Sequence, residues 1–164
     1  MKHLILFLCV IAFAGCGGIS VQQVYTTTDT FSGEVRQQTS LDCGNNFCTQ
    51  FTKVGDRATA YLGYSDDEWL FVEEIKMKIA GESDFLTFTG QFDRQVKSNA
   101  IIQEILTVPL DYKLASFMKR ALGKRVIVRF SGKSGFIETT SSIGLNGQWA
   151  QFLAVLDIQQ PLQA

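Results

Sequence analysis

The residues of this sequence that most clearly suggest a chemistry are basic side chains near its C-terminal end. Seven of the 14 Lys and Arg residues that follow position 15 fall between residues 113 and 133. Such a cluster suits anionic partners, for example lipid headgroups, lipopolysaccharide phosphates or an acidic protein. We expect Arg125, Arg129 and Lys133 to form an anionic-ligand patch. The alternative is a solvated helix face followed by outward-facing strand residues.

The sequence lacks the side chains that most catalytic and metal sites need. Its only histidine is His3, close to the N-terminus, so imidazole bases, catalytic triads and histidine metal ligands are excluded from the rest of the chain. It has no Gly-rich phosphate loop. We therefore expect no enzyme, no cofactor and no metal. Asp66-Asp67-Glu68 suits a hard cation, but a polar turn is the preferred interpretation.

Two cysteines stand close together in the middle of the chain. Cys43 and Cys48 are separated by Gly44, two Asn residues and Phe47. Two cysteines at short spacing indicate a disulfide if the chain is exported, as its N-terminus, described next, predicts. Gly and Asn tolerate the positive φ angles of a tight loop. A metal site built on two thiols is the competing interpretation, but it lacks further Cys or His ligands. We expect the disulfide.

The N-terminus has the organisation of a secretion signal. A basic start is followed by an apolar run from Leu4 to Ala14 and then by small residues. A transmembrane helix needs about 20 apolar residues, and this run has only eleven. A cleaved signal is therefore the better interpretation.

The residues at the end of this run resemble the lipobox of bacterial lipoproteins. Phe13-Ala14-Gly15-Cys16 places a cysteine after two small residues and a larger apolar one, although Phe13 stands where Leu is usual. The resemblance implies cleavage after residue 15 and a lipid on Cys16. An ordinary signal cut near Ala14, which leaves a secreted domain, is the alternative. Because Gly17 rather than Asp follows the cysteine, the resemblance implies the outer membrane of a Gram-negative bacterium, and we expect the domain to face the periplasm.

Length and composition predict one globular domain behind this leader. Residues 1–15 form the expected signal peptide, residues 16–23 a lipidated tether, and residues 24–164 a single domain of ordinary size. Without Lys2 the chain has 14 basic and 16 acidic side chains, a balance that gives no support for nucleic-acid binding.

The hydrophobic pattern predicts strands first and helices later. Glu74–Ile79 alternates, with Ile75, Met77 and Ile79 on one face and two lysines on the other. Further strands are expected at residues 21–30, 34–42, 58–64, 69–72, 85–89, 101–108, 125–130 and 136–140. Of these, we expect residues 58–64 and 69–72 to form a hairpin around a turn at residues 65–68.

Two segments have helical periodicity. Asp111 is suited to cap a helix that runs to about Leu122, and Gly123 is suited to end it. Asn146 is suited to cap a second helix, whose apolar residues recur at three and four positions from Trp149 to Leu156. The fold class predicted is α+β: an antiparallel β-sheet with two helices packed on one face.

This order of elements resembles a group of small uncharacterised bacterial envelope proteins. The shared features are the turn Phe31-Ser32-Gly33, the aromatic segment Trp69-Leu70-Phe71 and the strand and turn from Val126 to Gly132. The resemblance implies no known activity. We expect a non-enzymatic binding or structural lipoprotein that contacts the membrane through its lipid and an envelope protein or anionic polymer. The alternatives are a periplasmic inhibitor or immunity-type protein that blocks a hydrolase such as lysozyme, and a carboxylate-based hydrolase.

Overall fold

The chain folds into antiparallel β-structure with two short helices. The computed structural model describes residues 24–142, 148–154 and 156, so the predicted leader, Cys16, the tether and Asn146 lie outside the described residues. The described strands, in chain order, are β1 (Val24–Thr28), β2 (Val35–Thr39), β3 (Asp42–Gly44), β4 (Phe47–Val54), β5 (Arg57–Asp66), β6 (Val72–Ile79), β7 (Phe85–Thr89), β8 (Asp93–Val96), β9 (Ile102–Pro109), β10 (Arg125–Gly132) and β11 (Gly135–Ser142). The described helices are η1 (Ser98–Ala100, a 3₁₀ turn), α1 (Tyr112–Ala121) and α2 (Gln148–Ala154).

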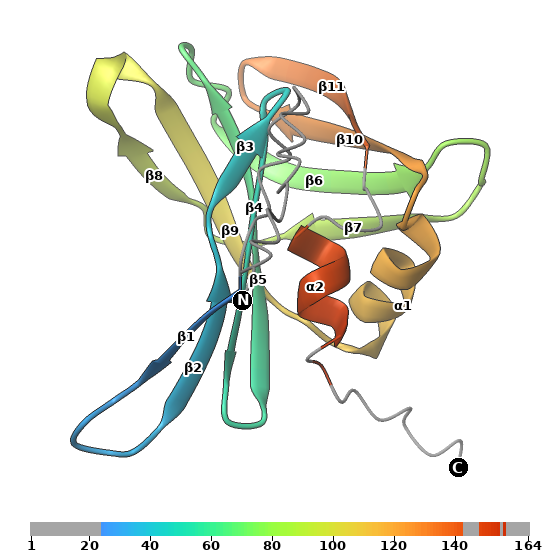
Figure 1. The fold of residues 1–164 in the computed structure, drawn as a ribbon. Helices are drawn as coiled ribbons and strands as arrows, with labels where there is room; N and C mark the ends of the chain where they lie inside the picture. The colour runs from blue at the N-terminus through green and yellow to red at the C-terminus, as the bar shows by residue number, and fades with distance from the viewer. Residues whose placement is uncertain (1–23, 143–147, 155, 157–164) are drawn as a thin grey trace, which may run out of the picture.

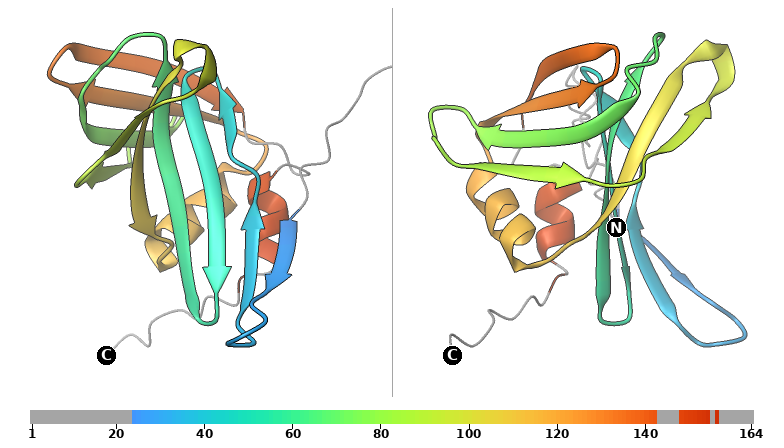
Figure 2. Two further views of the ribbon diagram at one scale, coloured as in Figure 1. Left: turned by 90° about the vertical axis from the view of Figure 1, so that its left-hand side faces the viewer. Right: turned by 180° about the vertical axis from the view of Figure 1, so that it is seen from behind.

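The described strands divide between two sheets rather than forming the single sheet that was predicted. The large sheet has the order β1-β2-β4-β5-β9-β8, with β3 also paired to β4, and the small sheet has the order β11-β10-β6-β7. The strands of the two sheets run across one another, and both helices lie on the same side of the large sheet as the small sheet (Figures 1 and 2). The antiparallel, strand-rich part of the prediction is confirmed.

One core fills the space between the sheets and the helices. The alternation predicted for β6 is confirmed, because Ile75, Met77 and Ile79 are buried on the inner face beside Val126 and its neighbours on β10. The core also contains aromatic contacts between β4 and α2, where the ring of Phe51 lies 5.4 Å from that of Phe152. These contacts attach the C-terminal helix to the large sheet.

The structure confirms the predicted start and end of the first helix. The Asp111 carboxylate accepts a hydrogen bond from the Leu114 backbone N–H at 2.8 Å, which satisfies one of the free donors at the helix start. At the other end Gly123 has a φ of 74°, a conformation that glycine adopts without strain. The predicted disulfide is present as well, joining Cys43 and Cys48 across the β3–β4 hairpin.

The predicted hairpin between residues 58–64 and 69–72 is wrong. Strand β5 pairs with β4 and β9, and the chain then leaves the large sheet after Asp66 and enters the small sheet at Val72. Residues 69–71 are not a strand but part of a crossover between the sheets. The polar segment that suggested a turn therefore ends one strand and begins this crossover.

A buried carboxylate holds the crossover in place. Glu104 of β9 is 0% exposed, and its two oxygens accept hydrogen bonds from the backbone N–H groups of residues 70–72 at 2.8 to 2.9 Å. The Arg94 Nε of β8 donates to the same carboxylate at 2.9 Å, and the Arg94 guanidinium also donates to the Val72 carbonyl. The carboxylate thus replaces the ladder partners that the crossover lacks.

The other side of the crossover lies against the small sheet. The backbone N–H groups of Lys133 and Ser134 face the carbonyl oxygens of Phe71 and Leu70. Gly132 is required there, because a Cβ at this position would overlap both of those carbonyl groups. The crossover is therefore bound from β9 on one side and from the β10–β11 turn on the other.

The role of Glu104 can be tested by replacing it with its amide. Glu104→Gln removes the charge that pairs with Arg94 and places an NH₂ group against backbone N–H donors, so we expect the free energy of unfolding to fall by about 3–5 kcal/mol. Chemical denaturation measures the change. Glu138→Gln is the matched control, because its ion pair with Arg129 is exposed and should contribute less than about 1 kcal/mol. Equal effects of the two substitutions would contradict the assignment.

Candidate functional site

The outer face of the small sheet brings together basic and aromatic side chains from four strands. Because the inner face buries the alternate residues of β6 and β10, Lys76, Lys78, Ile127 and Arg129 must all point outward. The strand register places Arg129 beside Lys76, and Ile127 beside Lys78. We call this surface the cationic face.

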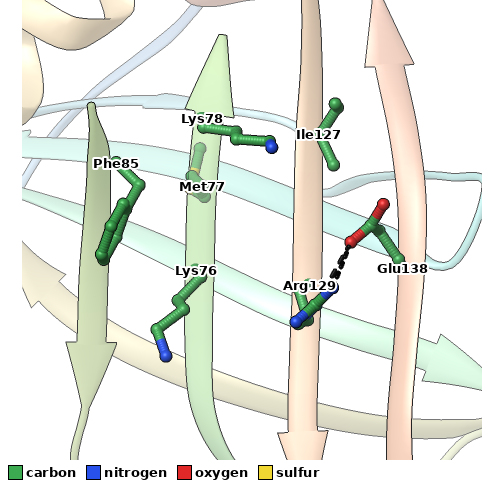
Figure 3. A pocket seen from close by; sticks show the side chains of 7 residues that line it. All are labelled: Lys76, Met77, Lys78, Phe85, Ile127, Arg129 and Glu138. Carbon is green, nitrogen blue, oxygen red and sulfur yellow. Dashed lines mark hydrogen bonds and ion pairs between the residues drawn. The ribbon is translucent and has the colours of Figure 1, made fainter. Parts of the chain in front are cut away.

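A shallow pocket of about 170 Å³ lies on the cationic face. It is lined by Lys76, Met77, Lys78, Phe85, Ile127, Arg129 and Glu138 (Figure 3). Phe85 of β7 is 58% exposed and forms an apolar wall, while Lys78 extends across the sheet toward Ile127. The pocket therefore offers cations beside an apolar surface.

The charges of the cationic face are only partly paired. Arg129 forms an ion pair with Glu138 at 2.9 Å, and its guanidinium lies 4.9 Å from the centre of the Phe136 ring. Lys76 forms an ion pair with Glu74 at 2.9 Å. Both pairs are exposed to water and so are weak, which lets their cations exchange partners at little cost.

Two cations of this face have no ion pair within the described part of the chain. They are Lys78, which lines the pocket, and Arg125, which lies on the same side of β10 as Ile127 and Arg129. The cationic face has four basic side chains, since Lys76 and Arg129 join these two. It also has two acidic ones, Glu74 and Glu138, so its net charge is two positive units. The face as a whole therefore attracts anions.

The structure brings together two of the three residues predicted for the anionic-ligand patch. Arg125 and Arg129 share the outer side of β10, whereas Lys133 lies exposed in the β10–β11 turn at the end of that strand. The basic segment as a whole does not form one patch. Arg120 and Lys124, near the end of α1, instead form ion pairs with Glu82 at 3.1 and 3.3 Å.

Sequence reasoning missed the contribution of β6 to this face. Lys76 and Lys78 were assigned to the outer side of their strand. Because they lie about fifty residues from Arg129 in the sequence, the pairing of their strand with that of Arg129 was not predicted. The signal that could have found them is the shared alternation of the two strands. Two strands with apolar inner faces, if paired, must also share their outer faces.

Asp66, the first residue of the acidic segment at residues 66–68, is used within the fold. The Asp66 carboxylate accepts hydrogen bonds from the Asn46 amide at 2.6 Å and from the Tyr64 hydroxyl at 3.1 Å. A backbone hydrogen bond from Asp67 holds the pKa of Asp66 below its ordinary value. Among the described residues no group of three or more His, Cys, Asp or Glu side chains is arranged to hold a metal ion.

Comparisons with known proteins leave the chain without a match. No family model, no curated protein and no solved structure matches it. Within the described residues no helix is long and apolar enough to span a bilayer. The resemblance to bacterial lipoproteins and to small envelope proteins therefore stays a prediction, and the function is inferred from the residues of the chain itself.

Proposed function

We propose that this chain is a lipid-anchored lipoprotein of the Gram-negative outer membrane that faces the periplasm. Residues 1–15 act as the signal peptide, Cys16 carries the lipid, and residues 16–23 tether the domain of residues 24–164. The domain acts without catalysis, as a binding or structural component of the envelope. The cationic face is the observation that supports a binding role.

The partner that this face suits best is an anionic polymer or protein of the envelope. Arg129 presents a planar guanidinium that matches phosphate and carboxylate oxygens, and Lys78 adds a point charge in the same pocket. The exposed ring of Phe85 provides an apolar contact beside these charges. In this proposal the two helices pack on one face of the sheet, as the contact between Phe51 and Trp149 favours, and the cationic face stays open for the partner.

A second function, inhibition of a hydrolase such as lysozyme, is favoured by the β1–β2 hairpin. This hairpin projects from the rest of the domain (Figure 1) and has Phe31, 99% exposed, in its turn. The Asp29 carboxylate accepts hydrogen bonds from the backbone N–H groups of Ser32 and Phe31 at 2.7 and 2.9 Å. These bonds hold the pKa of Asp29 below its ordinary value and keep the turn ordered at neutral pH. A preorganised aromatic tip is suited to enter the cleft of another protein.

The lipid anchor is tested by the variant Cys16→Ser. Mass spectrometry of the natural protein should find a diacylglycerol and an acyl chain on Cys16, and the protein should sediment with outer membranes. The variant should lack both modifications and should leave the membrane fraction, because at least two chains are needed for stable anchoring. An unmodified N-terminus, or retention of residues 1–15, would overturn the proposed location.

The cationic face is tested by charge reversal. Lys78→Glu or Arg129→Glu should weaken binding of the full chain in neutral detergent to lipopolysaccharide on the order of tenfold, because each charge near such a surface contributes about 1 kcal/mol. Glu138→Gln should strengthen binding by releasing Arg129. Titration at two salt concentrations measures the affinity.

Arg57→Glu is the matched control for this experiment. Arg57 is an exposed cation at the start of β5, directly after the β4–β5 turn, and it is not part of the small sheet. It should have little effect on binding. If it weakened binding as much as Arg129→Glu, net charge rather than the cationic face would be responsible.

The inhibitor function is tested with Phe31→Ala in a lysozyme assay. If the hairpin blocks the enzyme, this substitution should reduce inhibition at least about tenfold, as expected for a central aromatic contact. Phe136→Ala, which removes an exposed ring from the small sheet, serves as the control and should have no effect. Absence of inhibition by the unaltered protein would rule this function out for lysozyme.

A further inference from the structure

The outer face of the large sheet has a second pocket whose chemistry differs from that of the cationic face. It measures about 200 Å³ and is lined by residues of β4, β5, β8 and β9 and by neighbouring residues. On β4, β5 and β9 these residues alternate with those that face the core, so the pocket lies on the outer face of the sheet. Figure 2 (left) shows the strands of this face, with the helices behind them. Its polar lining includes Gln50, Tyr61, Asp93, Gln95, Lys97 and Gln103. We call it the amide pocket.

The side chain of Gln103 is the feature that points to a ligand. It is 7% exposed, and its amide oxygen has no hydrogen-bond partner among the described residues. Its NH₂ group has only a weak partner, the Cys43 sulfur at 3.5 Å. Buried amides in folded proteins are normally satisfied, and this one belongs to a residue that lines the pocket. A ligand that offers both a donor and an acceptor would satisfy Gln103.

The neighbouring polar groups favour a neutral ligand. Gln95 faces Gln103 across the β8–β9 ladder, and it accepts a hydrogen bond from the Lys97 ammonium at 2.6 Å. The NH₂ group of Gln95 donates to the Asp93 carboxylate at 3.1 Å. One acid and one base leave the pocket without net charge, while its amides supply both donors and acceptors. A polyhydroxyl or amide-bearing ring matches this set, and a phosphate does not.

The apolar residues that line the amide pocket restrict the class of ligand further. Leu41 and Ile105 border the pocket together with the ring of Tyr61. An acetamido group presents an N–H and a carbonyl for the amides and a methyl for these apolar side chains. The volume suits one ring-sized unit, since drug-sized ligands occupy pockets of roughly 300–1,000 Å³.

The backbone around the amide pocket is well fixed. Strands β4, β5 and β9 are interior strands of the sheet, paired on both sides. The disulfide at Cys43 holds the β3–β4 hairpin next to Gln103. A site on such rigid elements loses little freedom when it binds a ligand.

We propose that the amide pocket binds a neutral N-acetylated sugar unit of an envelope glycan. Gln103 and Gln95 hydrogen-bond the acetamido and hydroxyl groups, and Leu41 and Ile105 contact the acetyl methyl. None of the residues of the lipid anchor or of the cationic face lines this pocket. The sugar site therefore stands apart from them, whereas the assignment of the glycan to the envelope rests on the proposed location.

The experiment is a titration of the full chain in neutral detergent with N,N′-diacetylchitobiose, followed by NMR or calorimetry. Binding is expected for this disaccharide and should be at least about tenfold weaker for cellobiose, which has hydroxyl groups in place of the acetamido groups. Gln103→Leu should reduce the affinity for N,N′-diacetylchitobiose at least about tenfold. Asp93→Ala, at the exposed edge of the sheet, should also reduce it and does not depend on the core.

Arg129→Gln is the matched control, since it alters the opposite sheet and should leave sugar binding unchanged. Thermal unfolding of each variant shows whether it is folded, and Asp93→Ala decides the question if Gln103→Leu is not. Failure of the folded protein to bind N,N′-diacetylchitobiose, equal binding of cellobiose, or unchanged binding by the folded pocket variants would each overturn the proposal. Loss of lipopolysaccharide binding by Arg129→Glu, with sugar binding retained, would show that the two sites are separate.

Discussion

The carboxylate of Glu104 makes this two-sheet arrangement possible. A chain that passes from one sheet to another must leave backbone N–H groups without ladder partners, and burying such groups unpaired is costly. Here a side chain of β9 accepts from three consecutive N–H groups of the crossover and pairs with Arg94. Because β9 belongs to the large sheet and Val72 begins the small one, this single group fixes where the two sheets meet.

The position of that junction determines which faces remain at the surface. The small sheet turns its apolar side toward the common core, so its cations on β6 and β10 must face solvent. The large sheet does the same with its own inner residues, and this leaves Gln103 and Gln95 on the outer side. Two surfaces of different chemistry thus follow from one packing constraint: a charged face with aromatic rings, and a neutral pocket lined with amides.

Local pattern predicts the elements of this fold better than their pairing. The alternation of β6 and the Asp111 cap were both evident from neighbouring residues in the sequence. The crossover was not, because Glu104 lies more than thirty residues from the N–H groups it binds. For the same reason Arg129 was predicted as part of the anionic-ligand patch, whereas Lys76, its neighbour on the paired strand, was not. Contacts that depend on tertiary packing have no periodic signal in the sequence.

The proposed anchor changes what affinity such surfaces need. Seven residues, 17–23, separate Cys16 from β1, and even a fully extended tether of that length spans less than about 30 Å. A domain held so close to a bilayer encounters anionic headgroups and envelope glycans at a high effective concentration. Weak contacts then suffice for binding. An exposed ion pair such as Arg129–Glu138 suits such binding, because Glu138 holds the guanidinium in position and a competing anion can replace Glu138 at little cost. Under this constraint two modest sites on opposite sheets can act together, because the anchor has already restricted the motion of the domain.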